Sequence, residues 1–242
     1  MLLHPSELVG KVADWFYPRV CPGCGEISDR PGRHLCWDCY GRLELHTQAH
    51  CSVCGHPAEG GVAHAFVCGV CKSAKPAFDR ARSAGRFAGV LREQIHQFKY
   101  GNALWLRNDL VDLLHGCLLA HFSPETVDAV LPVPLHPVRQ RERSYNQAAL
   151  LSQELARRID RRFDGRSLVR TRKTETQTLF DAAHRRMNIL GAFEVARPEW
   201  VARRCILLVD DVMTTGATLN ECARMLKKAG ARSVWALTVG RG

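Results

Sequence analysis

Short apolar runs and stretches of helical periodicity alternate along the C-terminal two thirds of the chain. Runs rich in β-branched residues at 127–133, 205–209 and 234–239 predict buried strands, because strands covered on both faces are continuously apolar. A short strand is predicted at 168–171, and residues 81–87 predict a strand or a hairpin. This part of the chain therefore has the pattern of a sheet whose strands are separated by longer connections.

Apolar residues at helical spacing fill the intervals between these runs. They predict a helix through 91–98 that Gly101 ends, followed by helices over 103–121, 144–162 and 218–228. Strands that alternate with helices predict an α/β fold, in which helices flank a parallel sheet. The last strand–helix–strand unit should have a right-handed crossover.

The N-terminal third has a different pattern. Residues 6–16 predict a short amphipathic helix, but residues 21–71 have no sustained hydrophobic period and few large apolar side chains. We therefore expect three parts: an N-terminal helix over 1–18, a metal-binding module over 19–75, and an α/β domain over 76–242.

Eight of the eleven cysteines form four Cys-x-x-Cys pairs, separated by 11, 11 and 13 residues. The eight predicted metal ligands are Cys21, Cys24, Cys36, Cys39, Cys51, Cys54, Cys68 and Cys71. Two such pairs supply the four thiolates of one closed, structural zinc site, so four pairs predict two zinc ions. We expect the pairs to combine in sequential order, because each loop then closes locally, although interleaved pairing is also possible.

Two other interpretations of the cysteine pairs are less consistent with the sequence. A disulfide framework would require an exported chain, and the N-terminus lacks a basic segment followed by an apolar one. A thioredoxin-like redox motif would lie within a βαβ pattern, which the cysteine segment does not have. Metal binding would also supply the folding energy that this weakly apolar segment lacks.

Composition and charge narrow the functional classes. A content of 46% hydrophobic and 24% charged residues excludes a mainly disordered chain, and no apolar run approaches the length of a membrane span. We therefore expect a cytoplasmic protein without membrane contact. The 34 Lys and Arg residues against 24 Asp and Glu residues give a net charge of +10, which favours anionic partners such as phosphates or nucleic acid.

The strongest motif follows the predicted strand at 205–209. Two consecutive carboxylates, Asp210 and Asp211, come at the carboxyl end of this strand, where open α/β sheets bind ligands. The five residues that then lead into a helix are Thr214, Thr215, Gly216, Ala217 and Thr218. Backbone N–H groups at a helix start bind anions, and neighbouring carboxylates suit ribose hydroxyls. The segment therefore predicts a site for a ribose 5-phosphate group.

Residues 206–218 resemble the 5-phosphoribosyl-1-diphosphate (PRPP) motif of type I phosphoribosyltransferases without a gap. In that family the acidic pair contacts the ribose and the Thr/Gly loop holds the 5′-phosphate. The resemblance implies a type I phosphoribosyltransferase-like fold, catalytic roles for Asp210 and Asp211, and Mg²⁺ bound together with PRPP or a related ribose phosphate.

A second resemblance covers nearly the whole chain. The four cysteine pairs ahead of the PRPP motif, together with stretches at 98–102, 133–148 and 170–193, resemble the competence protein ComF family (ComFC/GntX-like proteins). The chain departs from the usual Arg-Gly-Phe-Asn-Gln of that family by having Ser144 in place of the glycine. This resemblance implies a double zinc ribbon and a role in DNA uptake during natural transformation, with single-stranded DNA and a ComF-family helicase as expected partners.

Several basic residues are candidates for the diphosphate and for a mobile loop that closes over it. The turn after 127–133 leads to Arg139, Arg141 and Arg143, and the polar stretch 171–178 has the character of such a loop. The remaining candidates are Arg170, Arg172, Lys173 and Lys99. Each single cation could equally be a solvated surface charge.

Three functions remain open from the sequence. The first is an enzyme that transfers phosphoribose from Mg·PRPP to an acceptor and releases diphosphate. The second is a non-catalytic PRPP- or nucleotide-binding module, and the third is an accessory factor that binds single-stranded DNA for a helicase. Residues 132–204 carry 16 Lys and Arg against 8 Asp and Glu. The candidates for DNA contact are Arg157, Arg158, Arg161 and Arg162, although a solvated helix face has the same pattern.

Overall fold

The computed structural model describes residues 18–58, 64, 66–172 and 187–242. The helix predicted over 6–16 lies outside the described residues, as do Lys173 and most of the predicted mobile loop.

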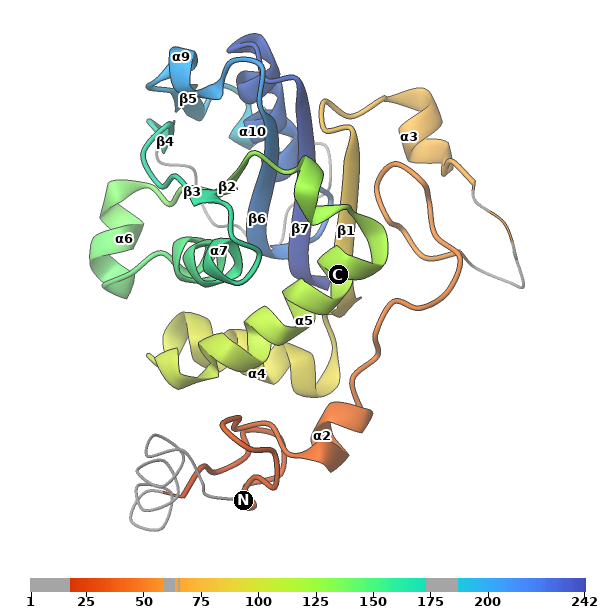
Figure 1. The fold of residues 1–242 in the computed structure, drawn as a ribbon, viewed down its shortest axis with the longest axis vertical. Coiled ribbons are helices and arrows are strands. Elements are labelled where there is room, and N and C mark those ends of the chain that lie inside the picture. Colours follow the sequence, from red (N-terminus) through yellow and green to blue (C-terminus); the bar gives the residue numbers. More distant parts are fainter. Residues whose placement is uncertain (1–17, 59–63, 65, 173–186) are drawn as a thin grey trace.

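A five-stranded sheet in the order β1-β7-β6-β2-β3 forms the centre of the molecule, and all its strands run parallel (Figure 1). The strands are β1 (Arg80–Arg86), β2 (Ala129–Pro132), β3 (Arg162–Phe163), β6 (Cys205–Met213) and β7 (Ser233–Arg241). The predicted parallel sheet is confirmed. Apolar side chains of β6 are buried on both faces of the sheet, which explains its continuous apolar run.

Helices cover both faces of this sheet (Figure 1). One face carries α4 (Gly89–Tyr100), α5 (Arg107–His121) and α7 (Gln147–Arg158), whose apolar residues share a core with Leu207 and Val209 of β6. The other face carries α10 (Ala217–Lys228), packed on the opposite side chains of β6. The shorter helices are η1 (Leu104–Leu106), η2 (Pro124–Thr126), α6 (Pro137–Arg143) and α9 (Pro198–Val201).

The helix predicted over 144–162 exists as α7 but is shorter at both ends, and a separate helix that was not predicted, α6, precedes it. Pro137 begins helix α6, and Ser144 ends it in the left-handed conformation with φ of 66°. Asn146 then caps α7 by accepting the backbone N–H of Ala149 at 3.3 Å. The predicted start at 144 was three residues early because the Asn146 cap sets the beginning of α7, and α6 was missed because a single cap at His136 sets its beginning.

Three strands differ in detail from the sequence prediction. The strand predicted at 168–171 exists as β4 (Leu168–Arg170), but it pairs antiparallel with β5 (Phe193–Val195) in a separate two-stranded ladder. The strand predicted at 205–209 extends to Met213, so the two carboxylates lie within β6. Strand β3 was not predicted, since its two exposed residues, Arg162 and Phe163, are too few to give a strand pattern.

The cysteine-rich segment forms two small units beside the α/β core, with helices α2 (Trp37–Gly41) and α3 (Gly69–Ser73). Figure 1 shows the unit with α2 next to α4, and the segment before α3 alongside β1. Each unit contains a short bridge, Val20↔Ile27 in the first and His50↔Pro57 in the second. No helix in the described part of the chain is long and apolar enough to cross a membrane.

Candidate functional site

The eight paired cysteines form two clusters in sequential order. The first cluster is Cys21, Cys24, Cys36 and Cys39, and the second is Cys51, Cys54, Cys68 and Cys71. Within each cluster all Sγ atoms lie within 4.8 Å of one another. The predicted sequential combination is therefore confirmed, and interleaved pairing is excluded.

The spacing of the sulfur atoms fits zinc. The Sγ atoms of Cys24 and Cys36 are 3.7 Å apart, and those of Cys54 and Cys68 are also 3.7 Å apart. A tetrahedral ion with Zn–S bonds of about 2.3 Å places its ligands roughly 3.8 Å apart. Four thiolates leave no open coordination position, so both donor sets fit structural zinc ions.

Backbone donors prepare one thiol in each cluster for ionisation. Burial opposes ionisation of Cys51, but backbone N–H groups, led by that of Cys68 at 3.3 Å, lower its pKa to about 6. In the first cluster, N–H groups of Cys36, Gly23 and Cys24 outweigh burial and lower the pKa of Cys21 to about 7. Zinc binds the thiolate, so these donors favour the form that ligates metal.

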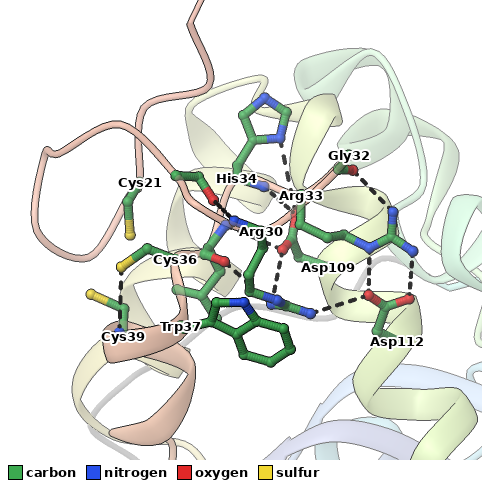
Figure 2. A network of polar contacts seen from close by, with 12 residues as sticks. Cys21, Arg30, Gly32, Arg33, His34, Cys36, Trp37, Cys39, Asp109 and Asp112 are labelled. Carbon is green, nitrogen blue, oxygen red and sulfur yellow. Dashed lines mark hydrogen bonds and ion pairs between the residues drawn. The ribbon is translucent and has the colours of Figure 1, made fainter. Parts of the chain in front are cut away.

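Ion pairs attach the first cluster to the sheet-covering helices (Figure 2). Asp109 of α5 is only 2% exposed, and it accepts the backbone N–H groups of His34 at 3.1 Å and Leu35 at 3.2 Å. The guanidinium of Arg30 lies 3.5 Å from the same carboxylate, and Arg33 forms two hydrogen bonds with Asp112. Burial raises the pKa of Asp109, whereas these backbone donors and Arg30 lower it.

The same network engages residues that we considered for DNA contact. Arg158 forms ion pairs with Asp112 at 2.6 Å and with Glu154 at 3.1 Å, and its side chain is only 16% exposed. Arg157 pairs with Glu154 as well, although its side chain remains exposed. Most of the positive charge on this helix face is therefore balanced by neighbouring carboxylates.

Strand β6 carries the two acidic residues of the predicted ribose site, and their side chains have different neighbours. Asp211 forms an ion pair with Lys99 of α4 at 2.9 Å. Burial, together with the charge of Asp211, raises the pKa of Asp210 to about 8, while Lys99 and Arg170 act in the opposite direction. The Asp210 carboxylate also accepts the backbone N–H of Asp211 at 2.9 Å.

Lys99 is held in place by the stretch around Tyr145. The Tyr145 hydroxyl donates to the carbonyl of Phe98, and the Gln147 amide donates to the carbonyl of Lys99 at 3.3 Å. Burial lowers the pKa of Lys99, but its ion pair with Asp211 outweighs burial and raises the pKa overall. Lys99, which the sequence analysis placed among the diphosphate candidates, is therefore a charged group beside the acidic pair.

The predicted phosphate loop has the conformation that its glycine requires. Gly216 has φ of 76°, and a Cβ atom at this position would lie 2.6 Å from Cε of Met213. Helix α10 begins directly after it at Ala217, whose N–H donates to Oγ1 of Thr215 at 3.4 Å. Thr218 follows in the first turn of the helix, where backbone N–H groups lack intrahelical acceptors.

The candidate diphosphate residues lie on two elements. Arg139, Arg141 and Arg143 belong to helix α6, and Arg143 donates to the Tyr100 hydroxyl at 3.0 Å. Burial and the charge of Arg139 lower the pKa of Arg170, and Asp210 raises it. The charges of Arg139 and Asp210 therefore both act on Arg170 in the folded chain.

Arg172 has a different position from the other arginines. Its guanidinium donates to the carbonyls of Asn188 and Leu190, each at 2.8 Å. It therefore connects the two sides of the segment 173–186, which lies outside the described residues.

A cavity of about 670 Å³ lies between the second cluster and the phosphate loop. The phosphate loop contributes residues 214–217 to its wall, and the second cluster contributes Cys54, Cys68 and Cys71. Arg241 at the end of β7 also lines the cavity, and sequence reasoning did not single it out. Arg241 can be recognised as a site residue only in the folded chain, where its guanidinium contacts Cys54.

Comparisons with known proteins agree with this architecture. The protein-family model for the double zinc ribbon domain matches residues 12–72, and the family model for the phosphoribosyl transferase domain matches residues 146–240. Competence protein F of Haemophilus influenzae is 35% identical over 221 residues, covering 84% of this chain and 95% of that protein.

Two further relatives and one solved structure complete the comparison. The DNA utilization protein YhgH of Escherichia coli K12 is 31% identical, over 84% of this chain and 96% of its own. Competence protein ComFC of Bacillus subtilis is 27% identical, over 88% and 86%. The structure of adenine phosphoribosyltransferase from Thermoanaerobacter pseudethanolicus matches with a TM-score of 0.37 and 14% identity, over 58% of this chain and 83% of that one.

Proposed function

Because the chain belongs to the competence protein ComF family, with a double zinc ribbon and a phosphoribosyltransferase domain, we propose that it binds Mg·PRPP and acts in DNA uptake. A competence role agrees with the names of its relatives, two of which are competence proteins and one a DNA utilization protein. The ligand assignment rests on the geometry at the carboxyl end of β6.

One observation carries the ligand assignment. Within nine residues, β6 and the start of α10 supply two carboxylates and a glycine loop at a helix N-terminus, and Lys99 lies 2.9 Å from the second carboxylate. The carboxylates suit the hydroxyls of a ribose, and the loop suits its 5-phosphate. The anionic ligand also brings charge that Lys99 can balance, which favours PRPP over an uncharged sugar.

Carboxylate oxygens are the donors that Mg²⁺ prefers, so Asp210 and Asp211 also fit a magnesium ion that arrives with PRPP. When bound, this ion supplies positive charge to the diphosphate. The pKa of Asp210 is raised to about 8, so this carboxyl group is largely protonated at neutral pH. Because the cation favours the ionised carboxylate, we expect the site to bind Mg·PRPP better above neutral pH.

The arginines around the acidic pair suit the diphosphate end of the ligand. Arg139 and Arg170 influence each other electrostatically, and the charge of Asp210 also acts on Arg170. The like charges of Arg139 and Arg170 repel each other, so a bound diphosphate would relieve this repulsion. Turnover would transfer phosphoribose to an acceptor, and these groups would stabilise the leaving diphosphate.

Calorimetric titration of Mg·PRPP into the zinc-loaded protein tests the proposal. We expect saturable binding by the wild type and at least a tenfold loss in Asp210→Asn/Asp211→Asn. The matched control Glu125→Gln/Asp160→Asn removes the same charge from exposed positions and should retain binding.

The outcomes separate the candidate functions. Binding with release of diphosphate in the presence of an acceptor would identify a transferase, whereas binding without turnover would identify a PRPP-dependent module. Absence of binding to a folded, zinc-replete wild type would reject the proposal. Salt-dependent binding of single-stranded DNA in that case would support the accessory role beside a helicase.

A further inference from the structure

The second cluster is built directly onto the sheet that carries the phosphate loop. The backbone N–H of Ala81 in β1 donates to the carbonyl of Val53 at 2.7 Å, and Arg82 donates to the carbonyl of Ser52 at 3.1 Å. A Cβ atom on Gly55 would lie 2.6 Å from the carbonyl oxygen of Ala81. The Cys51–Cys54 turn therefore contacts the backbone of β1 directly, and the Arg82 side chain adds a further bond.

Arg241 connects this turn to the end of β6. Its guanidinium donates to the carbonyl of Cys54 at 2.8 Å and lies 3.9 Å from the Sγ atom of the same residue. It also lies 3.3 Å from Sδ of Met213, the residue that pairs with Arg241 in the sheet. A positive charge beside a thiolate ligand stabilises the anionic metal site, as partners of metal ligands generally do.

Met213 in turn supports the phosphate loop. Its Cε atom occupies the space beneath Gly216 that a Cβ atom would need, at 2.6 Å. Its carbonyl accepts the backbone N–H of Gly242 at 3.1 Å, so both its main chain and its side chain are fixed. A contact chain thus runs from the metal ligand Cys54 through Arg241 and Met213 to Gly216.

We propose that Arg241 is a positioning residue that couples zinc at the second cluster to ligand binding at the phosphate loop. Without zinc, the Cys51–Cys54 turn loses the metal that fixes the carbonyl to which Arg241 donates. Arg241 and Met213 then no longer hold Gly216 in place. Coupling between two binding equilibria is reciprocal, so a bound phosphate ligand must also raise the affinity for this zinc ion, and we expect this as slower zinc release.

The first cluster offers a matched control. Arg42 donates to Sγ of Cys39 at 2.6 Å, which is the same kind of contact between a guanidinium and a zinc ligand. Arg42 is exposed and directly follows α2, in the unit that contacts α4 and α5, and it does not line the cavity at the phosphate loop. Arg42→Met should therefore weaken zinc binding at the first cluster only.

The experiment follows zinc release to a chromophoric chelator, with and without saturating Mg·PRPP, in wild type, Arg241→Met, Arg241→Lys and Arg42→Met. We expect two release phases in the wild type, of which Mg·PRPP slows one at least fivefold. Arg241→Met should abolish this protection and raise the Kd for Mg·PRPP about fivefold or more, and Arg241→Lys should restore part of both effects.

This inference rests on the proposed function, and the experiment distinguishes the two failures. If calorimetry shows no binding of Mg·PRPP to the wild type, the proposed function fails, and the coupling fails with it. If the wild type binds Mg·PRPP but neither release phase changes, only the coupling is wrong. Equal protection in wild type and Arg241→Met would also overturn it, because Arg241 would then carry no coupling.

Discussion

The two cysteine clusters have the same ligands but different surroundings. The first forms a small core of its own with Leu35, and ion pairs to Asp109 and Asp112 attach it to α5. The second shares the main hydrophobic core with side chains of β2, β6 and α10. The difference indicates that the first unit is an attachment to the α/β domain, whereas the second is a component of it.

The largest expected effect comes from removing one buried ligand from each cluster. Cys51→Ser should lower the melting temperature of the whole chain by about 10 °C or more, because lost zinc disrupts the main core. Cys39→Ser should lose one zinc ion as well, but the melting temperature of the sheet should fall by less than half as much. Metal analysis with thermal unfolding by circular dichroism measures both, and equal losses would contradict the distinction.

A smaller effect is expected from the ion pairs that attach the first cluster. Asp109→Asn keeps the shape but removes the buried charge that faces Arg30, which should cost about 1–3 kcal/mol of unfolding free energy. Chelator release of the first zinc ion should accelerate, with the second unchanged. Glu44→Gln removes an exposed partner of Arg86 and should change neither quantity. Acceleration of both zinc phases by Asp109→Asn would show that the units are not independent.

The smallest expected effect is a pH dependence of stability. It comes from Asp210 of β6, the strand that shares a core with the second cluster. The pKa of Asp210 is raised from 3.8 to about 8, so the folded chain holds a proton there that the unfolded chain releases. Stability should therefore fall as pH rises between these two values. Asp210→Asn removes this dependence, so its melting temperature should exceed that of the wild type by a few degrees near pH 9 and by less near pH 5. A difference that does not grow with pH would contradict the assigned pKa.

Local sequence patterns predicted the parts of the molecule that depend on local chemistry. The sequential combination of cysteine pairs follows from loop closure, and the β6–α10 unit follows from its apolar run and periodicity. Helix α6 was missed because two side-chain caps, at His136 and Asn146, set the boundaries. Such caps depend on single residues and leave no periodic signal.

Contacts between distant residues account for the rest of what the sequence could not predict. The ion pair of Lys99 with Asp211 joins residues more than a hundred positions apart, and Arg241 meets Cys54 across 187 positions. The partners of Arg158 were equally hidden, since Asp112 lies on another helix. A motif indicates which residues bear chemistry, but only the folded chain determines which charges meet.

The order of strands has a consequence for synthesis of the protein. Strand β1 lies at the edge of the sheet, and its only strand partner among the described residues is β7, so Ser83 pairs with Thr238, 155 positions later. At a ribosomal rate of about 5–20 residues per second, that partner emerges roughly 8–30 seconds after β1. Until then β1 has no partner strand, and the four thiols of the second cluster are open to oxidation. Early zinc binding by this cluster would protect these thiols and the strand beside them.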